Sequence, residues 1–374
     1  MNIGITCYPS VGGSGILACA LGEILAERQH HVHFISYERP FRLPEPLPER
    51  VHFHPVEIND YELFRYPDYT LPLSVKMAEV SREHRLDILH VHYAVPHATA
   101  AILARDMLTA EQRPKIITTL HGTDTTLLGR DAGYGPAIRH ALASSDAITT
   151  VSAYLKRETE SLLPTHLPIH VIHNFFSPRP ARRPREEVRR ELGVEEQALI
   201  VHISNLRPVK RIDLLLETAA RIRPRDSFKL LIIAGESFAS FRPEARRLGL
   251  EDRLIIREKV TDVEDYLNAA DLGLFTSESE SFCLAILEAM CFACPSVATC
   301  VGGIPEVVED QVTGRLVNAG DAEGLARAAE SMIQNPEIRK MMGRAGKKRA
   351  EERFSAQCIV PQYESLYRKV AAGS

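Results

Sequence analysis

Residues 272–299 read LGLFTSESESFCLAILEAMCFACPSVAT and carry the clearest fold signal of the chain. An apolar strand pattern at 272–276 is followed by a polar turn. A helical apolar pattern at 282–292 and a second strand pattern at 295–299 come next. Two short buried strands joined by a helix are typical of a parallel βαβ unit. The stretch therefore predicts an α/β protein with helices covering a parallel sheet.

The same alternation extends through both halves of the chain. In the first half it predicts strands near 2–8, 31–36, 51–56, 88–92, 115–121, 146–151 and 169–173, and helices near 14–28, 74–85, 96–109, 136–145 and 152–162. In the second half it predicts strands near 198–203, 228–234, 253–257, 272–276, 295–299 and 315–317. The helices of that half are predicted near 211–222, 240–248, 263–269, 282–292, 303–309 and 322–334.

A segment with three prolines and no periodicity, residues 174–184, separates the two halves. The predicted architecture is two doubly wound Rossmann-like domains, 1–173 and 185–352, facing across a cleft. The last stretch, 336–372, is predicted to form helices broken near Phe354. The final part, 353–374, is expected to pack back on the N-terminal domain. In such sheets ligands bind outside the carboxyl ends of the strands.

Composition indicates a protein without nucleic-acid or membrane partners. The 374 residues carry a formal net charge of −4, with 45% hydrophobic and 25% charged residues. The N-terminus is too short and polar for a signal peptide, and no apolar run approaches the length of a membrane span. The seven cysteines, an odd number, lie mostly in apolar runs. These features predict reduced thiols in a cytoplasmic protein, and they leave a homo-oligomer open.

Glu280 and Glu288 lie eight residues apart around the start of the predicted helix 282–292. If most of this stretch is helical, the carboxylates are separated by roughly 12 Å along the axis. That is about the span from the ribose of a nucleoside diphosphate to the sugar it carries. A helix N-terminus between them would offer free N–H groups to the diphosphate. The alternative is an amphipathic helix with two solvated glutamates.

Two further segments carry groups suited to a diphosphate. The run 204–213 contains Asn205, Arg207 and Lys210 and follows the first strand of the second domain. A lysine supplies a compact charge and an arginine a bidentate fork, although solvated cations at a helix start are the alternative. The run 300–306, Cys-Val-Gly-Gly-Ile-Pro-Glu, offers amides that suit an anion, or else forms a tight turn.

The loop after the first strand contains Gly13-x-Gly15-x-x-Ala18, and Glu38 ends the second strand. This pattern fits a dinucleotide fingerprint, so an NAD-binding domain is a rival interpretation. The glycines alone indicate only that the backbone approaches something closely at a helix N-terminus.

Histidines end two predicted strands of the first half, in the runs 90–97 and 120–124. Such histidines serve as acid–base groups, hydrogen-bond donors, metal ligands or buried structural groups. No His-Glu-x-x-His pattern and no Asp-x-Asp pattern is present. We therefore predict no catalytic metal and no cofactor.

Together these runs resemble the retaining glycosyltransferases of family four, which have the GT-B fold. The resemblance covers essentially the full chain, and its most specific part is the Glu-x7-Glu segment followed by the Val-Gly-Gly-Ile-Pro-Glu turn. The runs 3–15, 90–97, 118–124 and 203–211 are similar to family members that use UDP-N-acetylglucosamine and L-malate. The resemblance therefore implies transfer of N-acetylglucosamine to the malate hydroxyl. Another small acceptor, a nucleotide-sugar epimerase and a non-catalytic binding module are the alternatives.

The resemblance also implies roles for individual residues. Glu280 would bind sugar hydroxyls and Glu288 the ribose diol, while Arg207 and Lys210 would stabilise the leaving diphosphate. His121 would lie beside the reacting sugar and only steer, because the departing phosphate oxygen is expected to take the malate proton. The implied donor-binding set is completed by Gly13, Asn205, Phe282, Cys283 and Leu284, and the implied acceptor-binding set is Ser14, Tyr93, Thr119 and His121.

The chain departs from the family pattern near the donor site. Cys283 stands where the family usually has glycine, and Ala234-Gly235-Glu236-Ser237 replaces a Gly-x-Gly-Pro run. The amide of Cys283 can still bind phosphate if the residue tolerates the local backbone conformation.

Overall fold

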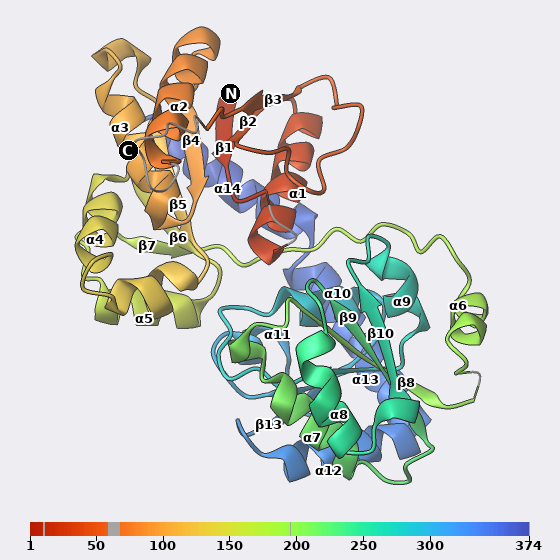
Figure 1. Cartoon of the computed structure of the whole chain (residues 1–374). Helices are drawn as coiled ribbons and strands as arrows, with labels where there is room; N and C mark the ends of the chain where they lie inside the picture. Colours follow the sequence, from red (N-terminus) through yellow and green to blue (C-terminus); the bar gives the residue numbers. More distant parts are fainter. Residues whose placement is uncertain (10–11, 59–67, 195, 374) are drawn as a thin grey trace. The chain divides into compact units, whose positions relative to one another are not determined.

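A computed structural model describes residues 1–9, 12–58, 68–194 and 196–373 (Figure 1). The chain divides into two compact units. The first contains Met1–Asn174 together with Ala356–Ser374, and the second contains Phe175–Ser355. No helix among the described residues is long and apolar enough to span a membrane.

The first unit is built on a seven-stranded parallel sheet of order β3-β2-β1-β4-β5-β6-β7. Its strands are β1 (Asn2–Thr6), β2 (His31–Ser36), β3 (Val51–Pro55), β4 (Ile88–His92), β5 (Lys115–Leu120), β6 (Ala147–Thr150) and β7 (Ile169–Val171). Its α-helices are α1 (Gly13–Glu27), α2 (Thr70–His84), α3 (Thr99–Asp106), α4 (Gly135–Ser144), α5 (Ala153–Leu162) and α14 (Ala356–Ala371). Strand order reverses between β1 and β4, where loops at the carboxyl ends form a ligand site in sheets of this kind.

The terminal helix α14 packs in the first unit, beside α1 (Figure 1). Glu364 accepts a hydrogen bond from Arg28 at 2.7 Å and pairs with His30 at 3.0 Å. The Tyr367 hydroxyl and Nδ1 of His90 in β4 are 2.8 Å apart. Apolar burial along α14 and these polar contacts attach the last helix to the first sheet although more than 180 residues of chain intervene.

The second unit has a six-stranded parallel sheet of order β10-β9-β8-β11-β12-β13. Its strands are β8 (Ala198–Ser204), β9 (Phe228–Ala234), β10 (Leu254–Glu258), β11 (Leu272–Phe275), β12 (Ser296–Thr299) and β13 (Gly314–Val317). Its α-helices are α6 (Arg185–Glu191), α7 (Ile212–Arg221), α8 (Arg242–Arg247), α9 (Val263–Ala269), α10 (Leu284–Cys291), α11 (Ile304–Val307), α12 (Ala322–Gln334) and α13 (Pro336–Arg353).

Side chains of the central strands in this unit alternate between two cores. Ile200, Leu230 and Ile232 face α7, α8 and α12, whereas Leu199, Val201, Leu231 and Ile233 face α6, α9 and α10. Burial on both faces explains why β8 and β9 are almost continuously apolar in sequence. This packing fixes the carboxyl ends of β8 and β11, from which the loops of the candidate site extend.

Residues 175–184 of the predicted linker belong to the second unit, and helix α6 follows them directly. Phe175 and Phe176 are buried, and the amides of Arg182 and Arg183 donate to Asp265 of α9. Helix α6, which periodicity did not reveal, is too short to show a pattern. It is held by arginines of its own that reach Asp271 at the start of β11.

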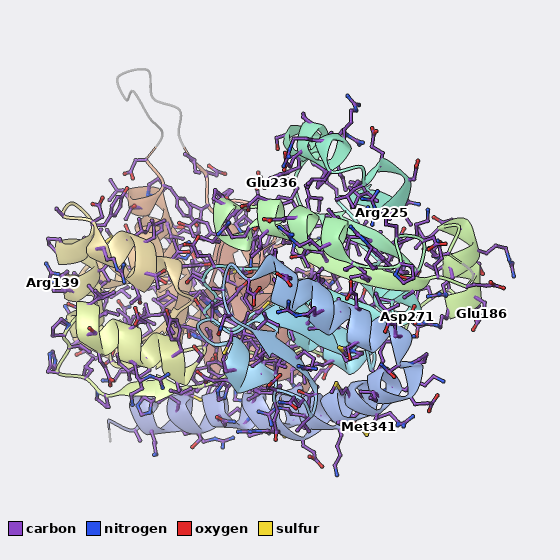
Figure 2. The ribbon with its side chains drawn as sticks, turned by 90° about the horizontal axis from the view of Figure 1, so that it is seen from below. Arg139, Glu186, Arg225, Glu236, Asp271 and Met341 are labelled. Atoms are coloured by element: carbon purple, nitrogen blue, oxygen red, sulfur yellow. The ribbon has the colours of Figure 1, made fainter. Side chains whose placement is uncertain are left out.

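That anchor consists of Arg185 and Arg189, which contact Asp271 at 2.6 and 2.8 Å. Asp271 also accepts the amide of Leu199. Figure 2 labels Asp271 and also Glu186, an exposed residue of α6. Arg185 and Arg189 thus form a structural ion-pair cluster with Asp271 within the second unit.

Candidate active site

Lys210 and Glu280 form the central contact of the candidate donor site in the second unit. Nζ of Lys210 donates to Oε1 of Glu280 at 2.6 Å, and the Ser277 hydroxyl donates to the same oxygen at 2.7 Å. The side chains are 23% and 9% exposed, respectively. Burial alone would lower the pKa of Lys210, but the attraction of Glu280 outweighs it and the pKa is raised. Lys210 is therefore a fixed cation with one face toward solvent.

Hydrogen bonds join the loop that carries Lys210 to the loop that carries Glu280. The Thr276 hydroxyl donates to the carbonyl of Lys210 at 3.1 Å, and the amide of Glu278 donates to the carbonyl of Val209 at 2.8 Å. The Thr299 hydroxyl, at the end of β12, donates to the carbonyl of Ser277 at 2.6 Å. Three strand ends thus fix the positions of Lys210 and Glu280.

The turn at Gly302 and Gly303 packs directly against the backbone of this loop. The amide of Gly303 donates to the carbonyl of Glu280 at 2.9 Å. A Cβ at Gly302 would lie 1.9 Å from that carbonyl oxygen, and a Cβ at Gly303 would lie 2.2 Å from the oxygen of Ser281. Gly302 also has a φ of +56°. The glycines are therefore required for close backbone packing, which is the tight-turn alternative of the sequence analysis.

Helix α10 spans Leu284–Cys291, within two residues of the predicted 282–292, and begins four residues after Glu280. Cys283 precedes the helix with φ of 69° and ψ of 74°, the left-handed region that favours glycine. Glycine, the residue of the family pattern at this position, would adopt this conformation without strain. The backbone turns here so that the amides at the start of α10 follow the Glu280 loop.

The remaining donor-site candidates near α10 differ in what they expose. The ring of Phe282 is buried in an edge-to-face contact with Phe354, with centroids 5.6 Å apart, so its backbone is the part left to bind a ligand. Burial raises the pKa of the Cys283 thiol well above its usual value, and the nearby Glu280 raises it further. The thiol is therefore neutral. Glu288 is buried on α10, one helical turn beyond Leu284.

Asn205 and Arg207 lie in the loop between β8 and α7. Oδ1 of Asn205 is buried and has no hydrogen-bond partner in the described part of the chain. Gly235 packs against the backbone of Asn205, since its Cβ position is 3.5 Å from that Cα. Arg207 is exposed, and its charge acts to lower the pKa of Lys210. An unpaired amide oxygen and two neighbouring cations are suited to a polar, anionic ligand.

In the first unit the structure brings Ser14 and Tyr93 together. The Tyr93 hydroxyl donates to Oγ of Ser14 at 3.0 Å. Ser14 is in the first turn of α1, which begins at Gly13. Tyr93 follows β4 with φ of 85°, an unusual conformation for a bulky residue that is commonly found at functional sites. The amides of Gly13 and Ser14 lie at the N-terminus of a 15-residue helix, which favours anions.

His121 lies beside Tyr93 and His92. Nδ1 of His92 and Nε2 of His121 are 2.8 Å apart, and the rings of Tyr93 and His121 are 5.1 Å apart. Burial, reinforced by His97, lowers the pKa of His121 to about 3. His121 is therefore neutral at physiological pH and takes part in hydrogen bonding, not in ion pairing.

Asp124, which the sequence analysis did not single out, ties the two histidine loops together. Its carboxylate accepts the amide of Ala94 at 2.9 Å and the amide of His121 at 3.2 Å. Burial raises the pKa of Asp124 to about 7. Asp124 therefore sets the positions of Tyr93 and His121 through the backbone.

Thr119 is buried in a polar network under this site. Its hydroxyl lies 2.7 Å from Nε2 of His90 and 2.6 Å from the hydroxyl of Thr149. His90 in turn contacts Tyr367 of α14. The structure thus places Thr119 behind Tyr93, whose amide donates to the Thr119 carbonyl at 2.9 Å.

Sequence reasoning also missed Ser277 and Tyr8. Ser277 holds Glu280, and the ring of Tyr8 lies 5.3 Å from Tyr93 and 4.6 Å from His97. Each lay inside a run that had been recognised, but loop residues have no periodicity that marks them. The signal that was present is their position directly after a buried strand.

Comparison with known proteins identifies the family. The model of glycosyltransferase family 4 matches residues 11–180, and the model of glycosyl transferases group 1 matches residues 184–349. N-acetyl-alpha-D-glucosaminyl L-malate synthase of Bacillus anthracis is 42% identical over 373 residues, which cover 99% of this chain and 97% of the relative. D-inositol 3-phosphate glycosyltransferase of Kribbella flavida is 27% identical over 336 residues, which cover 81% of this chain and 77% of the relative.

Solved structures show the same fold. Sucrose-phosphate synthase from Thermosynechococcus elongatus has a TM-score of 0.83 at 19% identity and covers 100% of both chains. Both sheets of the present chain are parallel and doubly wound, as the sequence predicted. The chain belongs to glycosyltransferase family 4 and is a glycosyltransferase with the GT-B fold.

Proposed function

We propose that this enzyme transfers N-acetylglucosamine from UDP-N-acetylglucosamine to the hydroxyl of L-malate with retention of the α configuration, the first step of bacillithiol biosynthesis. The observation that carries the proposal is the 42% identity, over almost the whole chain, to an enzyme named for this reaction. The runs 90–97 and 118–124, which contain Tyr93 and His121, belong to the aligned length.

The second unit is proposed to bind the donor. Lys210 and Arg207 bind the diphosphate, with the amides at the start of α10 completing the anion site. Oε1 of Glu280 binds Lys210, and the other carboxylate oxygen is proposed to accept a hydrogen bond from a hydroxyl group of the sugar. Glu288 binds the ribose diol. The unpaired Oδ1 of Asn205 accepts a further hydrogen bond from the nucleotide-sugar.

In the reaction the bond from the sugar C1 to the β-phosphate oxygen breaks, and a bond from C1 to the malate hydroxyl oxygen forms on the same face. The malate proton passes to the departing phosphate oxygen, which leaves as UDP. The protein's contribution is stabilisation of the leaving group and positioning of both substrates. Two cations and a helix N-terminus supply that stabilisation without a divalent metal.

The first unit is proposed to bind malate through Ser14, Tyr93 and the amides at the start of α1. The Ser14–Tyr93 pair offers hydroxyl groups, and the helix N-terminus offers positive dipole and free N–H groups to a carboxylate. His121, held neutral by burial, donates or accepts a hydrogen bond to the reacting sugar without adding charge. Thr119 supports this site from behind.

Product analysis tests the proposal. The purified chain is incubated with UDP-N-acetylglucosamine, with and without L-malate, and products are separated by mass spectrometry. Release of UDP that requires malate and yields an α-linked glucosaminyl malate supports it. A changed sugar without malate would instead indicate epimerisation. Turnover only with an inositol phosphate would identify that compound, and not malate, as the acceptor.

A further inference from the structure

Five histidines gather at one edge of the first unit, on strands β2 and β3 and at the end of α2. His31 and His33 lie on β2, His52 and His54 on β3, and His84 is the last residue of α2. In the strand register His33 is paired with His52, so these side chains share one face of the sheet. In the strand order this edge is separated from β5, which leads to His121, by β1 and β4.

Three of these imidazoles converge on one another. One nitrogen of each of His33, His54 and His84 lies within 4.8 Å of the others. Nδ1 of His33 and Nε2 of His54 are 3.0 Å apart. The ring of His84 lies 4.4 Å from that of His33 and 5.2 Å from that of His54, between centroids. Two nitrogens on one tetrahedral zinc ion, each at about 2.0 Å, lie roughly 3.3 Å apart, close to the His33–His54 separation.

The imidazoles of His33 and His54 are uncharged at neutral pH. Burial, followed by the neighbouring histidines, lowers the pKa of His33 to about 3 and that of His54 to about 4. A neutral imidazole keeps one lone pair for a ligand bond. When the hydrogen between the facing nitrogens of His33 and His54 moves to the far nitrogen of its own ring, both facing nitrogens carry a lone pair.

The two cations described beside this cluster each contact another side chain. Lys76 of α2 acts on His54, but its Nζ is paired with Glu79 at 2.6 Å. Arg50 contacts the exposed His31, which is not one of the three converging histidines, at 3.0 Å. His33 is buried, whereas His54 and His84 are partly exposed, so an ion has a path from solvent.

We propose that His33, His54 and His84 bind a divalent late first-row transition metal of the Zn²⁺ class, with solvent in the fourth position. Imidazole nitrogen is a favoured ligand of Zn²⁺, Co²⁺, Ni²⁺ and Cu²⁺, whereas Mg²⁺ and Ca²⁺ prefer oxygen. The ion would connect β2, β3 and α2. Its role is separate from glycosyl transfer, because none of the three histidines belongs to the donor or acceptor set.

The experiment titrates the untagged, full-length chain with Co²⁺ and follows the visible absorption of tetrahedral cobalt. One equivalent is expected to bind, to be displaced by Zn²⁺, and to be unaffected by excess Mg²⁺. His84→Gln and His54→Gln each remove one ligand and are expected to weaken binding at least roughly tenfold. His84 is partly exposed, so its variant is expected to stay folded, as thermal unfolding without metal will check.

His140→Gln is the matched control, because it removes an exposed histidine outside the cluster. It should leave cobalt affinity unchanged. Zn²⁺ should raise the unfolding temperature of the native chain and of His140→Gln, but much less that of His84→Gln. Absence of the tetrahedral cobalt spectrum, or equal affinity in the native chain, His54→Gln and His84→Gln, would overturn the proposal.

Discussion

Replacing Gly302 by alanine tests whether the Glu280 loop must be held in place for catalysis. The new Cβ would lie 1.9 Å from the carbonyl oxygen of Glu280, whereas Cβ contacts below 3.0 Å essentially do not occur. The two groups must therefore separate by about 3.0 − 1.9 = 1.1 Å. The contact atom is backbone, so no side-chain rotation relieves it.

A displacement of this size is large for a catalytic group. Misplacement by about 1 Å can lower the rate of a positioned reaction roughly 100-fold, which corresponds to about 2.7 kcal/mol. Glu280 holds Lys210 at 2.6 Å, so both groups would move. We expect kcat/KM to fall roughly 100-fold, with most of the loss in kcat because Gly302 itself contacts no substrate in the proposed arrangement.

Gly320→Ala is the matched control. Gly320 also has a positive φ, +79°, but its Cβ position has nothing within 4 Å. Both variants bear the cost of a left-handed alanine, roughly 1–2 kcal/mol, and only Gly302→Ala displaces Glu280. The assay is malate-dependent UDP release, with thermal unfolding measured in parallel. The expected difference in kcat/KM between the two variants is roughly 100-fold. If kcat/KM of Gly302→Ala were within about threefold of that of Gly320→Ala, the position of Glu280 would not limit the rate.

Three further predictions follow from the two units. Lys210→Ala is expected to lower kcat about 10²–10³-fold while circular dichroism stays native, and near-normal turnover would contradict its role at the diphosphate. EDTA is expected to leave turnover unchanged, and strict dependence on an added divalent ion would remove the metal-free mechanism. Glu364, whose pKa is lowered to about 2 by hydrogen bonding to Arg28 despite burial, stabilises the fold above about pH 4.5, and this contribution is lost as pH falls toward 2. Glu364→Gln should therefore lower the free energy of unfolding by about 3 kcal/mol at pH 7 and by much less near pH 2, as measured by urea titration. A difference independent of pH would exclude this origin.

Two site residues have backbone conformations that their side chains disfavour. Cys283 and Tyr93 both have positive φ, at the start of α10 and at the end of β4, respectively. Non-glycine residues persist there only when surrounding contacts hold them, at a cost of roughly 1–3 kcal/mol each. Cys283 is buried, and the Tyr93 amide is bound by the Thr119 carbonyl. We interpret both as positions where substrate binding is favoured over local stability.

The sequence by itself determined the order of strands and helices, because apolar periodicity is a local property. β2, β4, β9, α9 and α12 have the bounds that periodicity predicted, and most other elements differ by at most two residues at either end. Apolar periodicity gave the wrong prediction where polar contacts or an unusual backbone conformation decide the local structure. Helix α6, which is held by ion pairs to Asp271, was not predicted. Helix α10 starts two residues later than predicted because Cys283 turns the backbone.

Motif recognition singled out the loops of the candidate site but not the contacts between them. Glu280 and Lys210 were both singled out, yet their pairing joins residues 70 positions apart and could not be inferred from spacing. The same holds for Asp124 and for the three histidines of the β2, β3 and α2 edge. Sequence periodicity reports which face of an element is buried. Only tertiary packing decides which loop ends meet, because that depends on strand order and on close backbone contacts such as Gly302 against Glu280.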